Sequence, residues 1–119
     1  MNHTRLLTGV VLALVVIGGL LAVPIAEERA LGAEERYVSS QLEDASCLGS
    51  WGTNEGTVSR AARITGVTAS GLRVSVTLPY AYMTERDGQT IHADTASEAV
   101  YAVSLTGTRR VSGDTISPC

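Results

Sequence analysis

Few side chains in this 119-residue chain have the types and spacing that support chemistry. His92 and Asp94 stand two residues apart, so in a strand both would point to one side, and Glu98 follows them. Imidazole and carboxylate groups are zinc ligands, but three of them in a turn-prone stretch are a weak signature for a metal site. We therefore predict no metal ligand, no cofactor-binding residue and no catalytic residue.

The motifs of common catalytic and nucleotide-binding sites do not occur in the sequence. Serine is plentiful, yet no GxSxG pattern surrounds one, and a phosphate loop, GxGxxG, HExxH and CxxC are all missing. The sequence therefore predicts a protein that is not an enzyme.

Two cysteines, Cys47 and Cys119, allow a single intramolecular pairing. A bond between them closes a loop of about 73 residues, which chain-entropy reasoning values at about 4 kcal/mol. Oxidation would leave no thiolate to act as a nucleophile. We predict a disulfide, and with it an oxidising compartment.

Residues 6–26 form an apolar run in which Thr8 alone carries a polar side chain. This run determines where the rest of the chain is held. A helix of this length covers about 30 Å, the thickness of a bilayer's hydrocarbon core. Arg5 precedes the run and Glu27 follows it, and flanking positive charge stays on the cytoplasmic side. The prediction is a single-pass cell-membrane protein whose N-terminus is cytoplasmic and whose C-terminal domain lies outside.

The apolar run also has two alternative roles, which stay open. It could be a signal peptide, although cuts after Ala26, Ala30 or Ala33 place Pro24, Glu28 or Leu31 at position −3, where small residues are preferred. It could also be a buried helix of a soluble protein. Gly18–Gly19 would permit close approach of a second helix, so self-association through the apolar helix is a candidate interaction.

Charge excludes one class of partner. All nine basic residues are Arg, and beyond residue 26 eight of them face twelve acids, a balance of −4. Nucleic-acid binding needs clustered positive charge, so none is predicted. Arg109–Arg110 is the only basic pair, and we expect it to be solvated.

Helical periodicity follows the apolar run. In residues 27–46 the apolar side chains fall on one helical face at spacings of seven, four and three, namely Leu31, Val38, Leu42 and Ala45. This segment is expected to be a separate juxtamembrane helix, and Pro24 to mark a kink or the membrane boundary.

Beyond the helix, Gly and Asn make residues 47–56 a predicted loop around Trp51. Trp51 is a candidate partner contact, although a lid over the small core beside Cys47 is favoured because the chain has no Phe. Period-two patterns then predict strands at 57–68 and 72–82, a third that starts at 89–95 and is extended or resumed at 99–106, and a short fourth at 108–116. Residues 85–88 are expected to form a turn that Asp87-Gly88 closes.

The fold expected is α+β: a cytoplasmic N-terminus (1–5), a transmembrane helix (6–26), a juxtamembrane amphipathic helix (27–46) and an extracytoplasmic antiparallel meander of about four strands (47–119). This order of parts resembles type IV pilins and pseudopilins, with Pro24 and the Cys47–Cys119 pair at matching places. The family's Glu five residues after its processing Gly is replaced here, since Leu14 follows Gly9 at that spacing. The all-Arg composition also resembles small haloarchaeal or actinobacterial membrane-anchored proteins without an assigned function.

The function expected is therefore a binding or structural role at the cell envelope, performed by a small domain held at the bilayer through residues 6–26. Two alternatives remain: a pilin-like filament subunit, which the resemblance implies, and a secreted enzyme or inhibitor released by cleavage. The protein partner is not specified by the sequence.

Overall fold

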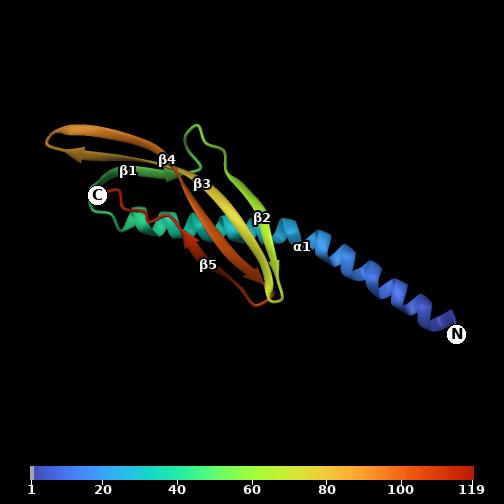
Figure 1. Cartoon of the computed structure of the whole chain (residues 1–119). Helices are drawn as coiled ribbons and strands as arrows, with labels where there is room; N and C mark the ends of the chain where they lie inside the picture. Colours follow the sequence, from blue (N-terminus) through green and yellow to red (C-terminus); the bar gives the residue numbers. More distant parts are fainter. Residues whose placement is uncertain (1) are drawn as a thin grey trace.

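The computed structural model describes the backbone of residues 2–119 and the side chains from Val23 onward. One long helix, α1 (Asn2–Glu43), carries a five-stranded antiparallel sheet on its C-terminal half, as Figure 1 shows. The strands are β1 (Leu48–Thr53), β2 (Ala61–Thr68), β3 (Gly71–Arg86), β4 (Gln89–Ser104) and β5 (Gly107–Gly113). The predicted α+β class is confirmed; the four-strand count is wrong.

The sheet is built around a hairpin of two 16-residue strands, β3 and β4. β5 pairs with β4, while the free edge of β3 takes two partners in succession. β2 pairs with residues 71–77 of β3, and β1 pairs with residues 80–84. The fifth strand therefore fits into the sheet because β3 is long enough to serve both.

Residues 47–56, expected to be a loop, contain strand β1. Glycine is typical of turns, which is why the segment reads as a loop. In a strand interior Gly leaves no side chain to pack, and this costs less in an edge strand, which has a single neighbour. β1 has β3 as its one partner and carries a bulge between Leu48 and Ser50. The chain leaves the strand at Asn54, whose φ is 60°. The next strand accordingly begins at Ala61, not at residue 57.

The predicted hairpin turn is confirmed at Asp87-Gly88, but it is shorter than expected, because Glu85 and Arg86 belong to β3. Asp87 and Gly88 have positive φ, 53° and 75°, and Arg86 pairs with Gln89 directly across them. This is the two-residue loop that Asp-Gly favours, because its twist matches that of the flanking strands. β4 continues from it without interruption to Ser104, so the two pieces considered for residues 89–106 are one strand.

Helix α1 is continuous, so residues 27–46 do not form a helix of their own. It passes through Pro24 and ends at Glu43, after which Asp44 N and Ala45 N donate to Ser40 O and Leu42 O. Leu31, Val38 and Leu42 are buried as expected, while Ala45 lies beyond the helix end.

The core lies between this helix and one face of the sheet, in two clusters. The first joins Ala26, Ala30 and Leu31 to alternate side chains of β3 and β4, namely Val74, Val76, Ala99, Tyr101 and Val103. The second joins Val38 and Leu42 to Leu78, Tyr80 and Ile116. Alternation in the strands and four-residue spacing in the helix thus bring the two apolar faces together.

A disulfide closes the far end of the domain. Cys47 follows the helix by four residues and is bonded to Cys119, with the two Cα atoms 5.8 Å apart. Ile116, three residues earlier, is buried against the second cluster. The C-terminal segment is therefore held to the end of α1 by one covalent bond and one apolar contact.

The predicted membrane anchor, residues 6–26, lies outside the described side chains for all but its last four residues. Among the residues that are described, no helix combines the length and the apolar character that a membrane span requires.

We expect the double substitution Cys47→Ser with Cys119→Ser to lower the free energy of unfolding by about 4 kcal/mol. The disulfide closes a loop that spans most of the domain, and without it the unfolded chain gains conformational entropy. Urea unfolding of the full chain in detergent, followed by circular dichroism, measures the loss. As a control, intact mass should show two alkylated cysteines only after reduction. Alkylation of the unreduced folded protein would contradict the bond.

Candidate functional site: a buried carboxylate between helix and sheet

The residues singled out for metal chemistry lie apart from the core. His92, Asp94 and Glu98 share one face of β4, as their even spacing predicted, and it is the face turned away from α1. All three are exposed. Within residues 23–119 no three His, Cys, Asp or Glu side chains gather closely enough to hold a metal ion.

Trp51 lies in edge strand β1, opposite Tyr82, with 39% of its surface exposed. It is not among the side chains packed against either core cluster. The lid expected of Trp51 is instead formed by Leu48 and Tyr82, which pack on the second cluster with Tyr37. A partner contact at Trp51 stays a prediction.

The charged group that no sequence motif indicated is Glu34. It stands four residues after Ala30 and four before Val38, so the helix places it in the middle of the apolar stripe. Its side chain is completely buried, between the two core clusters. A charge inside an otherwise apolar i, i+4 row was the signal that could have revealed it.

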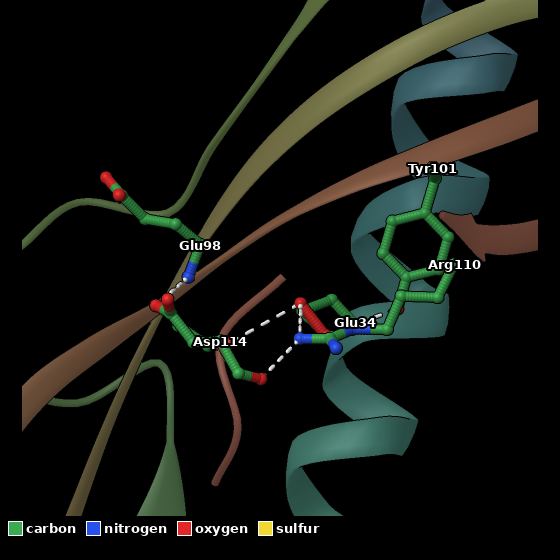
Figure 2. A network of polar contacts seen from close by, with 6 residues as sticks. Glu34, Glu98, Tyr101, Arg110 and Asp114 are labelled. Atoms are coloured by element: carbon green, nitrogen blue, oxygen red, sulfur yellow. Dashed lines mark hydrogen bonds and ion pairs between the residues drawn. The ribbon is translucent and has the colours of Figure 1, made fainter. Parts of the chain in front are cut away.

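Four hydrogen bonds satisfy the Glu34 carboxylate (Figure 2). Arg110 donates twice, from Nε to Oε1 at 2.9 Å and from Nη2 to Oε2 at 3.3 Å. Tyr101 donates its hydroxyl to Oε1 at 3.2 Å, and Ser97 donates to Oε2 at 3.4 Å. Each carboxylate oxygen therefore accepts two bonds, which is the condition under which a buried ion pair is tolerated.

Arg110 reaches this position because of strand alternation. β5 places Arg110 opposite Tyr101, on the helix face, and Arg109 opposite Ala102, on the outer face. Arg109 is solvated as expected, but the expectation for Arg110 is wrong: in a strand, one of two consecutive residues must point inward. A Cβ at Gly113 would lie 2.6 Å from Arg110 Nη2, so the glycine leaves room for the guanidinium.

Further contacts fix the Arg110 guanidinium. Its Cζ lies 3.9 Å from the centroid of the Tyr37 ring, and Nη2 donates to Asp114 O at 2.9 Å. The Asp114 carboxylate accepts from Glu98 N at 2.9 Å, and Figure 2 shows these residues as one chain of contacts. The ion pair is thus tied to both strands β4 and β5 as well as to the helix.

Electrostatics around Glu34 act on its neighbours. Burial raises the pKa of the Tyr101 hydroxyl above its ordinary value, and the charge and hydrogen bond of Glu34 raise it further, while Arg110 opposes them. Burial alone would lower the pKa of Arg110, but its hydrogen bond to Glu34 and the Glu34 charge outweigh that effect and raise it. Tyr101 therefore stays a neutral donor and Arg110 a cation.

Glu35, the next helix residue, holds a different part of the domain. Its carboxylate accepts from Thr53 Oγ1 at 3.3 Å and Asn54 Nδ2 at 3.4 Å, and Arg60 lies 3.6 Å away. Two adjacent helix residues therefore hold different parts of the sheet: Glu34 binds β5 in the buried core, and Glu35 binds the β1–β2 connection at the surface. Because Glu34 accepts four hydrogen bonds and has no exposed surface, its carboxylate holds β4 and β5 in position against the helix.

Comparison of the chain with protein-family models, with curated protein sequences and with solved structures gave no significant match.

We expect Arg110→Ala to lower the free energy of unfolding by about 3 kcal/mol, because it leaves the Glu34 carboxylate buried without its counter-ion. The neighbouring Arg109→Ala, at an exposed position, should change it by less than about 0.5 kcal/mol. Adding Glu34→Gln to Arg110→Ala should recover part of the loss. Urea unfolding of all variants measures this, and equal losses for the two arginines would refute the ion pair's role.

Alkaline pH should destabilise the domain through Tyr101. Its folded-state pKa lies above the unfolded value of about 10, so its contribution is complete below pH 10 and is lost as the pH rises further. We expect Tyr101→Phe to lower stability by about 2 kcal/mol at pH 7, through the lost hydrogen bond, and to flatten the decline above pH 10. Unfolding curves from pH 8 to 12 test this; parallel declines in both proteins would contradict it.

Proposed function

We propose that the chain is a single-pass envelope protein whose apolar N-terminal run anchors an extracytoplasmic α+β domain with a binding or structural role. The observation that carries this proposal is the direct continuation of the apolar run into the core. Ala26, the last residue of the run, is itself buried against the sheet, and the helix that contains both is continuous to Glu43. The run therefore has no linker between it and the domain it would anchor.

The flanking charges and the disulfide support the orientation. Arg5 precedes the run, and Glu27 and Glu28 follow it, a distribution that favours a cytoplasmic N-terminus. The Cys47–Cys119 bond belongs to the other side, since disulfides persist in oxidising compartments. These two signals come from different residues and favour the same arrangement.

A role in binding or support is favoured over chemistry by the way the polar groups are used. The buried carboxylate of Glu34 is saturated with donors from the sheet, and Glu35 is engaged by the β1–β2 connection. Because the Glu34 and Glu35 carboxylates hold the sheet to the helix, they favour a domain that presents a rigid surface.

A filament subunit is the second candidate, and the shape of α1 favours it. The helix runs from Asn2 to Glu43, its C-terminal half packs under an antiparallel sheet, and a disulfide closes the C-terminal end. Type IV pilin-like proteins follow the same plan. In that case self-association would occur through the apolar half of the helix, and processing after Gly9 would expose Val10 as the new N-terminus.

The mass and location of the cellular protein distinguish these proposals. An anchor predicts the full-length chain in the membrane fraction, resistant to carbonate extraction. A filament subunit predicts a chain that begins at Val10, and a secreted protein predicts a soluble chain that begins beyond residue 26. Intact mass spectrometry of both fractions measures this. A tag after Cys119 should be digested by protease in intact cells; its protection would invert the topology.

A further inference from the structure

An apolar side chain occupies the tip of the β4–β5 turn, where neither the turn nor the core requires one. Leu105 is fully exposed, at 101% of its reference area, in a two-residue turn closed by the pairing of Ser104 with Gly107. Leu105 and Thr106 do not have positive φ, so the turn accepts most residue types and does not call for leucine. Leu105 also packs on neither core cluster, so its apolar side chain is left to the solvent.

The β2–β3 turn lies beside this one, and a second exposed apolar side chain accompanies it. Leu72 pairs with Val103, which brings the two turns together at one end of the sheet, as Figure 1 shows. Val67, close to the β2–β3 turn, is 78% exposed. We call the two turns with Val67 and Leu105 the turn tip.

The turn tip contacts the helix, and these contacts fix its distance along the helix axis from the end of the apolar run. Arg29 Nη1 donates to Ser104 O at 3.3 Å, and Glu28 and Arg29 line one hollow together with Leu105. Arg29 comes three residues after Ala26, so it lies about 4.5 Å beyond the end of the apolar run. The headgroup layer on each side of a bilayer is about 5–7 Å thick. If residues 6–26 span the membrane, the turn tip lies at headgroup level.

We propose that the turn tip docks into the headgroup layer of the membrane that holds residues 6–26, with the Leu105 side chain inserted toward the acyl boundary. This inference rests on the proposed anchor and adds a second attachment to the same bilayer. The turn tip and the helix would then contact lipid at two laterally separated places. Two contacts prevent the helix from pivoting, so the domain would hold one orientation above the membrane surface.

Two arginines next to the turns supply a polar partner for lipid phosphate. Arg73 and Arg109 flank Ala102 in one row on the outer face and line a hollow of about 320 Å³ with Thr68 and Ser70. Within residues 23–119 neither arginine forms an ion pair; Arg109 is exposed, whereas Arg73 is partly buried and its Nη1 atom is buried without a hydrogen-bond partner. Glu27 and Glu28, at the helix, offset this charge, so the apolar contact is the main attraction.

Fluorescence of the full chain in phosphatidylcholine vesicles tests the proposal. In a Trp51→Tyr background, Leu105→Trp gives a single indole at the turn tip. We expect its emission to shift to shorter wavelength on reconstitution and to lose intensity when the lipid carries bromine on its acyl chains. Val67→Trp in the same background is a second probe at the turn tip, with the same expected result.

The unsubstituted chain is the matched control, because its own Trp51 lies two residues from Thr53, which contacts Glu35. Glu35 comes nine residues after Ala26, about 13 Å beyond the run, so Trp51 should be neither shifted nor quenched. Circular dichroism and alkylation of reduced and unreduced protein check that each variant is folded.

Flotation of the vesicles separates failure of this proposal from failure of the anchor. Protein that floats while both turn-tip indoles stay unquenched overturns the docking and leaves the anchor intact. Protein that does not float overturns both. Emission that shifts in lipid-free detergent as the protein concentration rises would show that a second copy covers Leu105, and would also overturn docking to lipid.

Discussion

The bond between Glu34 and Arg110 is the constraint on which the arrangement of helix and sheet depends. A buried carboxylate loses its hydration, and only donors at fixed positions compensate for that loss. Here the donors come from Ser97 and Tyr101 on β4 and from Arg110 on β5. A helix shifted by one turn would bring Ala30 or Val38 to the same place and leave Arg110 without an acceptor. The ion pair therefore fixes the register of the helix against the sheet, in addition to the packing of the apolar clusters.

Local periodicity explains what could be predicted from the sequence. The alternation of residues 72–82, the turn at Asp87-Gly88, and the buried positions Leu31, Val38 and Leu42 all depend on neighbours within a few residues. The α+β class follows from them. The count of strands does not, because β1 is specified by the free edge of β3, 27 to 36 residues away, and its own glycines indicate a turn. Helix continuity through Pro24 likewise could not be predicted locally, because Pro inside a helix usually kinks or ends it.

The candidate site was harder to predict because its partners are distant in sequence. Glu34 and Arg110 are separated by 76 residues, and their pairing requires the register of β5 against β4. Two local signals were present nonetheless. Glu34 interrupts an apolar i, i+4 row, and one residue of the Arg109–Arg110 pair had to point toward the core. Neither signal identifies the partner, because the helix-side neighbours of Arg110 in β5 are Thr108 and Gly113 and do not form an apolar face that the arginine interrupts.

Three attachments distributed along one helix make the helix and the sheet a single mechanical unit. Ala26 and Ala30 pack under the sheet near the apolar run, Glu34 is bonded at the centre, and the Cys47–Cys119 bond closes the end. Each attachment restrains a motion that the others allow: the apolar contacts resist separation, the ion pair resists sliding and the disulfide resists unravelling of the last residues. A restraint applied to the apolar run would therefore be transmitted to the sheet without a hinge, and the orientation of the outer face would follow that of the helix.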